Sequence, residues 1–300
     1  MPDLARGVIG NTPVFGTGIP SSSLGGPVYF SSFESPQSPT MSDTQPIQPA
    51  SIILAAGKGT RMGSDLPKVL HPVCGRPMLH WVVDAVRAAG SRKILMVVGH
   101  GADLVRDSFG DDTSDLEFIL QEEQKGTGHA VLVCREALGE FTGDSFVLAG
   151  DGPLIRAETL RTLAAHHASR NALATLATSI LEDPTGYGRI IRNESDRFVA
   201  IVEHRNATDA QRAICEVYPS YACFNTPDMM QRLENLDPDS DSGEYYLTSI
   251  PGQIQQETDR VEVVAAVPAE DVLSINTPEQ LAAVDAVLRE RLSNGTEVVS

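Results

Sequence analysis

Short apolar runs alternate with amphipathic segments along most of the chain. The apolar run over 51–56 and the segment over 145–149 are typical of strands that are buried in a sheet, and further strands are predicted over 93–98 and 116–120. Helices are predicted between these strands, over 77–89, 127–138 and 156–167. Alternation of strands and helices predicts an α/β fold, with a mostly parallel central sheet and helices on both of its faces.

The second half of the chain adds further elements to this pattern. Residues 172–181 are predicted as one long strand, and a strand-rich part follows around a Pro-Thr-Gly-Tyr-Gly turn at 184–188. Thr277-Pro278-Glu279-Gln280 has the form of a capping box with proline at the first helical position. This motif predicts a C-terminal helix that runs to about Leu292.

Residues 1–50 differ from the rest of the chain. They are rich in Ser, Pro, Gly and Thr and carry few periodic apolar positions. Neither the basic and apolar regions of a secretory signal nor the arginine-rich composition of a transit peptide is visible. We therefore predict a disordered N-terminal extension over 1–50, one domain over 51–294 and a short tail over 295–300.

The formal net charge of −17 narrows the choice of partners. Such a surface repels nucleic acid and anionic membranes, although a pocket inside an acidic protein can still carry the local cations that a nucleotide requires. No apolar run reaches the roughly 18 residues of a membrane span. The four cysteines form no C-x-x-C pair, which favours reduced thiols and a cytoplasmic protein.

A glycine-rich turn follows the first predicted strand, at Leu54 to Gly59. Glycines there let backbone N–H groups approach an anionic or planar ligand closely, and Arg61 and Lys68 would supply positive charge for phosphates. The turn lacks G-x-x-x-x-G-K-[ST], and Met62 stands where the dinucleotide fingerprint has its third glycine, which weakens the case for a nicotinamide oxidoreductase. We predict a nucleotide loop of another kind, with a solvated Lys68 as the alternative.

Three other polar positions should meet this loop, because ligands of such sheets bind beyond the carboxyl ends of the strands. Asp151 follows a buried strand, and its carboxylate suits Mg²⁺, which binds through one or two protein oxygens and keeps phosphates as further ligands. Asn276 is a second oxygen donor, immediately before the C-terminal helix. Gln121 ends another strand and could pair a donor and an acceptor with the edge of a nucleobase, while Gly126 and Thr127 open the next helix. The alternative for Asp151 is a turn-forming residue, that for Asn276 is an Asx turn at the helix start, and that for the segment from Gln121 to Thr127 is an ordinary loop between strand and helix.

Taken in order, these segments resemble the uridyltransferase domain of the bacterial bifunctional enzyme that makes UDP-N-acetylglucosamine. The resemblance covers about 52–292, nearly the whole chain after the N-terminal extension. It rests on several motifs: Leu54 to Met62, Leu66-Pro-Lys-Val-Leu-His71, Gln121 with Gly126-Thr-Gly-His-Ala130, Gly150-Asp151, Asp183-Pro-Thr-Gly-Tyr-Gly-Arg-Ile190, Ile201-Val-Glu-His204 and Gly243-Glu-Tyr-Tyr246. Leu-Ala-Ala-Gly with Pro-Lys-Val-Leu-His favours this branch over the glucose-1-phosphate nucleotidylyltransferases.

The resemblance implies a Rossmann-like nucleotide-diphospho-sugar transferase fold and a Mg²⁺-dependent reaction. The 1-phosphate of N-acetylglucosamine would attack the α-phosphorus of UTP, and pyrophosphate would leave. The resemblance implies these roles: the uridine would be held by Leu54, Ala55, Ala56, Gly57, Gln121, Gly126 and Thr127, the phosphates by Arg61 and Lys68, Mg²⁺ by Asp151 and Asn276, and the amino sugar by Gly188 and Glu203.

The sequence departs from the family at three points. Tyr218 occupies a sugar-binding position where the family usually has asparagine, and Ala149 replaces a residue that is often aromatic. The hexapeptide pattern of the acetyltransferase β-helix is missing. Because of Tyr218, two alternatives stay open, namely another hexose or hexosamine 1-phosphate as substrate and a nucleotide-sugar binding protein without turnover.

Overall fold

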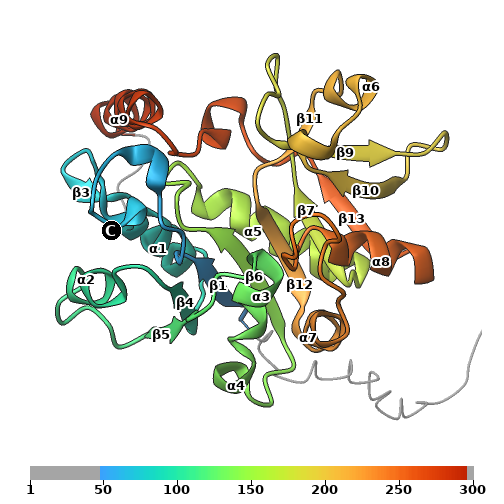
Figure 1. Ribbon diagram of the computed structural model, residues 1–300, viewed down its shortest axis with the longest axis horizontal. Coiled ribbons are helices and arrows are strands. Elements are labelled where there is room, and N and C mark those ends of the chain that lie inside the picture. Colours follow the sequence, from blue (N-terminus) through green and yellow to red (C-terminus); the bar gives the residue numbers. More distant parts are fainter. Residues whose placement is uncertain (1–47, 296–300) are drawn as a thin grey trace, which may run out of the picture. The chain divides into compact units, whose positions relative to one another are not determined.

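A seven-stranded sheet forms the centre of the computed structural model, which describes residues 48–295 (Figure 1). Its strands, in their order across the sheet, are β13 (Val261–Val264), β7 (Ala174–Ala177), β12 (Tyr221–Asn225), β6 (Asp144–Ala149), β1 (Ala50–Leu54), β4 (Ile94–Val98) and β5 (Leu116–Leu120). All neighbouring strands are parallel except the two pairs that contain β12. The predicted α/β fold with a mostly parallel sheet is confirmed.

Most of the predicted extension and of the predicted tail falls outside the described residues. β1 begins at Ala50, one residue inside the segment that was predicted to be disordered. The prediction for 1–47 and for 296–300 lies outside the part that the structure describes.

Helices cover both faces of the sheet because alternate residues of each strand point to opposite sides. Ile53 belongs to one hydrophobic core, together with α1 (Met78–Ala88), α5 (Ala157–Arg170) and α9 (Pro278–Ser293). The neighbouring Ile52 belongs to a second core, with α3 (Thr127–Leu132), α7 (Thr226–Glu234) and α8 (Ser249–Glu257). The three layers fix the strand ends that carry the polar residues singled out above. Shorter helices are α2 (Ala102–Asp107), α4 (Arg135–Leu138) and α6 (Asp209–Arg212).

A second, four-stranded antiparallel sheet forms the predicted strand-rich part. Its order is β10 (Phe198–Val202), β9 (Gly188–Arg192), β11 (Glu216–Tyr218) and β8 (Ser179–Ile180). Together with α6, most of it lies at the upper right of Figure 1. A small hairpin of β2 (Pro72–Val73) and β3 (Arg76–Pro77) precedes α1.

Two predicted elements were wrong in their continuity. The expected strand over 172–181 is divided into β7 and β8, which belong to different sheets. The break lies at Thr178, because both of its backbone groups bond to the segment at the end of β13. Its N–H donates to Val264 O, and its carbonyl accepts from Val267 N–H. The expected helix over 127–138 is divided into α3 and α4, since Cys134 N–H bonds three residues back, to Val131 O. Within the described residues, no helix is both long and apolar enough to cross a bilayer.

Candidate active site

The loop after β1 brings the first of the predicted cations into place. Gly59 has a left-handed backbone (φ 62°), and a Cβ there would lie 2.5 Å from Lys68 Cβ, so only glycine fits against this lysine. Pro67 is extended (φ −48°, ψ 133°) and leads into a single 3₁₀ turn, Lys68–Leu70. Arg61 lies on a similar short turn, Thr60–Met62.

The four charged or amide side chains predicted to meet phosphates and metal form one cluster. Lys68 Nζ donates to the Asp151 carboxylate and, at 2.9 Å, to Asn276 Oδ1. Arg61 Nη2 donates to the same Asn276 oxygen at 2.8 Å. The Lys68 and Asp151 side chains are only 14% and 18% exposed. The structure therefore brings together residues that are more than 200 positions apart in the chain.

Local backbone bonds hold the two oxygen donors of this cluster. The end of β6 is bonded to β1 through Gly150 N–H and Leu54 O, 2.9 Å apart, and Asp151 follows at once. At the start of α9, Thr277 accepts from Gln280 N–H as predicted, but the Gln280 side chain reaches past Thr277 and accepts from Asn276 N–H at 2.8 Å. The capping residues thus also orient Asn276.

The donor set fits Mg²⁺. A single ammonium group, that of Lys68, touches both Asp151 Oδ2 and Asn276 Oδ1, so these two hard oxygens already share a cation between them. One carboxylate and one amide oxygen suit Mg²⁺ when substrate phosphates complete its coordination. Among residues 48–295, no group of three or more His, Cys, Asp or Glu side chains could form an all-protein metal cage.

The predicted base-binding residues are held by their neighbours. Gln121 is 4% exposed, and its Nε2 lies 3.2 Å from Gly126 O and 3.0 Å from His129 Nδ1. Gly126 has φ 97°, and a Cβ there would lie 2.6 Å from Tyr245 O, so the segment around Tyr245 packs directly on the start of α3. The Thr127 hydroxyl accepts from Leu247 N–H at 3.1 Å. His129 lies in the Gly126–Ala130 motif, but its contact with Gln121 was not predicted.

Three cavities that share lining residues lie at the carboxyl ends of the strands. Cavity A, of about 590 Å³, is lined by all seven residues predicted for the nucleotide and also by Arg61, Lys68 and Asp151. Cavity B, of about 340 Å³, is lined by Gly188, Glu203, Tyr218 and Asn276 and shares Arg61, Ala149 and Asp151 with cavity A. Cavity C, of about 490 Å³, shares Glu203 and Tyr218 with B and Leu54 and Thr127 with A.

Two titratable side chains that line both cavity B and cavity C, Glu203 and Tyr218, are shielded from water. Burial raises the pKa of the Glu203 carboxyl, an effect that the Thr248 hydroxyl, 3.4 Å from Glu203 Oε1, partly offsets. Tyr218 is buried, and desolvation raises the pKa of its hydroxyl, which makes no hydrogen bond to any residue of the described part. Gly188 pairs with Tyr218 across β9 and β11, where a Cβ would lie 2.9 Å from Ile201 Cγ2. The predicted sugar-binding residues are thus neighbours.

Ser220 is a lining residue that the sequence did not reveal. It lines all three cavities and has a left-handed backbone (φ 67°), which is costly for a residue with a Cβ. Glycine would have signalled such a turn in the sequence, whereas serine gives no sign of it.

Comparison with known proteins decides the family. The chain matches the model of the MobA-like NTP transferase domain over residues 51–237. It belongs to this family. The predicted class of enzyme, a nucleotidyltransferase, is confirmed, and so is the expected resemblance.

Named relatives of this NTP transferase domain come from several bacteria. The bifunctional protein GlmU of Brevibacillus brevis is 42% identical over 244 residues, which are 81% of this chain and 52% of the relative. The proteins of the same name from Halalkalibacterium halodurans and Geobacter metallireducens are each 43% identical and cover 81% of this chain. The chain spans about half the length of these curated relatives. The roles assigned above to single residues stay predictions.

Proposed function

We propose that this chain transfers a uridylyl group from UTP to N-acetylglucosamine 1-phosphate, with Mg²⁺ as cofactor. The observation that carries the proposal is the placement of the cluster Arg61, Lys68, Asp151 and Asn276. Arg61 and Asp151 line both cavity A, which carries the predicted base-binding residues, and cavity B, which carries Glu203 and Tyr218, while Lys68 lines A and Asn276 lines B. A reaction that joins two phosphates needs cations at the point where its two substrates meet.

The reaction requires positioning and charge neutralisation more than acid–base catalysis. A phosphate oxygen of the sugar phosphate forms a bond to the α-phosphorus of UTP, and the bond from that phosphorus to the oxygen bridging to the β-phosphorus breaks, releasing pyrophosphate. The attacking oxygen is already anionic, so no residue need remove a proton from it. Mg²⁺ held by Asp151 and Asn276 would neutralise negative charge on the phosphates.

Lys68 and Arg61 would supply the remaining positive charge. In the structure, Lys68 donates to Asp151 Oδ2 and Asn276 Oδ1, and Arg61 donates to Asn276 Oδ1. These are the oxygens proposed as metal ligands. Lys68 and Arg61 also line cavity A, where the triphosphate would lie. At an effective dielectric of ~20, a pair of unit charges at ~4 Å interacts by about 4 kcal/mol. Because each ~1.4 kcal/mol felt only in the transition state raises the rate about tenfold, this interaction is worth up to about three powers of ten.

Cavity B would receive the sugar. Glu203 offers a carboxylate acceptor, and Tyr218 offers a hydroxyl that has no partner within the described residues. N-acetylglucosamine 1-phosphate is the first choice because the relatives at about 40% identity are named GlmU. Tyr218, in place of the family's usual asparagine, makes another hexose or hexosamine 1-phosphate the second candidate.

Pyrophosphate release tests the proposal. Purified protein should release pyrophosphate from UTP and N-acetylglucosamine 1-phosphate with Mg²⁺, and excess EDTA should stop the reaction. Asp151→Asn should lower turnover by about two orders of magnitude or more. Asp144→Asn, at the other end of the same strand, is the matched control and should leave turnover nearly unchanged. Absence of release with every sugar 1-phosphate would refute the proposal, and tight UDP-sugar binding without release would indicate a binding protein.

A further inference from the structure

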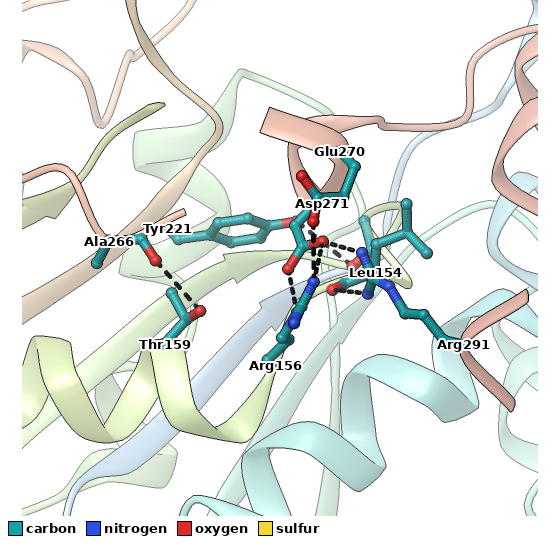
Figure 2. A network of polar contacts seen from close by, with 9 residues as sticks. Leu154, Arg156, Thr159, Tyr221, Ala266, Glu270, Asp271 and Arg291 are labelled. Carbon is teal, nitrogen blue, oxygen red and sulfur yellow. Dashed lines mark hydrogen bonds and ion pairs between the residues drawn. The ribbon is translucent and has the colours of Figure 1, made fainter. Parts of the chain in front are cut away.

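A network of ion pairs around the buried Asp271 joins the two segments that carry Asp151 and Asn276. Asp271 is 1% exposed, and its carboxylate accepts from Arg156 Nε at 2.5 Å and from Arg156 Nη2 at 3.0 Å. Arg291, on α9, also donates to Asp271. Figure 2 shows the two guanidinium groups converging on this one carboxylate. Arg291 Nη1 additionally donates to Leu154 O at 3.1 Å, and Arg156 Nη2 to Glu270 at 3.2 Å.

The network joins the two segments that carry the oxygen donors. Leu154 and Arg156 lie three and five residues after Asp151. Asp271 lies five residues before Asn276, and Arg291 lies on the helix that begins just after it. One backbone bond already connects the segments directly, from Ile275 N–H to Asp151 O at 3.1 Å. The network is therefore placed to hold Asp151 and Asn276 at a fixed separation.

The chemistry of the network suits this task. A two-bond contact between arginine and carboxylate fixes the relative orientation of the groups as well as their distance. Buried ion pairs contribute little net stability. Removal of one partner is nevertheless costly, because it leaves an unpaired charge in the interior, and this cost favours the one geometry in which all the charges are paired. Asp271 lines neither cavity A nor cavity B, so it can affect the site only indirectly, and its side-chain contacts with Arg156 and Arg291 provide such a route.

We propose that Asp271 is a positioning residue that, through Arg156 and Arg291, sets the separation of Asp151 and Asn276 and thereby the affinity of the site for a divalent cation. The inference rests on the proposed function in taking these two oxygens as the cation ligands. The proposal predicts that weakening this network lowers the affinity for the cation, whereas weakening an ion pair elsewhere in the fold lowers thermal stability but leaves that affinity nearly unchanged.

The test compares this network with a similar ion pair at the opposite edge of the sheet. Arg87 Nε and Nη2 donate to Asp115 at 2.8 and 2.6 Å, just before β5 begins. We would measure Mn²⁺ binding by electron paramagnetic resonance in the presence of UTP, and thermal unfolding, for Asp271→Asn and Asp115→Asn. We expect a loss of Mn²⁺ affinity of about 10-fold in Asp271→Asn and of less than about 2-fold in Asp115→Asn, although both unfold at lower temperature.

A milder pair of variants decides the matter if Asp271→Asn does not fold. Arg156→Lys keeps the charge and loses the two-bond fork, and Arg87→Lys makes the same change at the control pair. Arg156→Lys should bind Mn²⁺ about 3-fold more weakly, and Arg87→Lys should bind it like the unmodified chain. Equal Mn²⁺ affinity in Arg156→Lys and Arg87→Lys would overturn the inference. Failure of the unmodified chain to release pyrophosphate would instead count against the proposed function.

Discussion

The two ends of the candidate site differ in how their polar groups are satisfied. At the phosphate end, Lys68 forms an ion pair with Asp151, and both Lys68 and Arg61 donate to the amide oxygen of Asn276. In cavity B, Glu203 and Tyr218 are largely buried, burial raises the pKa of both, and the tyrosine hydroxyl has no protein partner within the described residues. The polar side chains at the end proposed for chemistry thus bond to one another, whereas the Tyr218 hydroxyl at the end proposed for sugar recognition is free to bond a ligand.

The difference follows from the elements that build each end. Cavity A lies at the carboxyl ends of β1, β5 and β6, where turns and helix starts place backbone groups and cations together. Cavity B is formed in part by the separate antiparallel sheet, whose β9 and β11 contribute Gly188 and Tyr218. A hydroxyl that lines a cavity and bonds to no protein group can form a hydrogen bond with a correctly shaped ligand. Such an end is suited to discrimination between sugars.

Lys68→Ala should give the largest effect at the paired end. Turnover should fall by about 10²-fold or more, because phosphate charge in the transition state loses a partner that is little exposed to water. Lys93→Ala is the matched control, since Lys93 lies just before the amino end of β4, and the candidate site lies at the carboxyl ends of the strands. Rates of pyrophosphate release measure both variants. A Lys68→Ala rate close to that of Lys93→Ala would remove this lysine from the catalytic machinery.

Tyr218→Phe tests the unpaired end alone. Loss of the hydroxyl should raise the KM for the sugar phosphate by about 10-fold while the KM for UTP changes by less than about 2-fold. Initial rates at varied concentrations of each substrate separate the two constants. Equal effects on both substrates would mean that Tyr218 does not belong to a separate sugar end.

Ser220→Gly probes the point where the cavities meet. Glycine adopts φ 67° without the steric cost of a Cβ, so the free energy of unfolding should rise by about 1 kcal/mol. Asn171→Gly, at the end of α5, is the control, and it should gain only a few tenths of a kcal/mol because asparagine tolerates the left-handed region. Urea unfolding measures both. No gain at Ser220 would show that its conformation is not strained.

Glu203→Gln should give the smallest effect, seen in the pH dependence of stability. Because burial raises the pKa of Glu203 above its unfolded value, the folded chain holds this proton to higher pH than the unfolded chain. The free energy of unfolding should therefore fall as the pH rises from the pKa of Glu203 in the unfolded chain to its higher pKa in the folded chain. Urea unfolding between pH 4 and pH 8 should show that this decline is missing in Glu203→Gln. An unchanged profile would mean that Glu203 is not desolvated.

Much of the fold could be predicted, because its central strands are short, mainly apolar segments bounded by turns. β5 matches its predicted bounds, and β6 begins one residue early. The break at Thr178 could not be foreseen, since the run of Ala, Thr, Leu and Ser around it is compatible with one continuous strand. The backbone partners that redirect it, Val264 and Val267, lie more than 80 residues further along the chain.

The site could be predicted where topology alone gathers its residues. Asp151 and Gln121 end strands of one parallel sheet, so the rule for strand ends placed them with the loop after β1. Ser220 and Asp271 were missed for different reasons. The conformation of Ser220 leaves no trace in its residue type, and Asp271 acts through arginines whose distance in sequence hides their contact.

The most direct test of the account is a competition among sugar 1-phosphates. Protein, Mg²⁺ and UTP would be mixed with equal concentrations of glucose, galactose, glucosamine, N-acetylglucosamine and N-acetylgalactosamine 1-phosphates, and the nucleotide sugars formed would be separated and identified by mass and retention time. We predict that UDP-N-acetylglucosamine forms first and dominates. Preferential formation of any other nucleotide sugar, or of none, would contradict the proposed function.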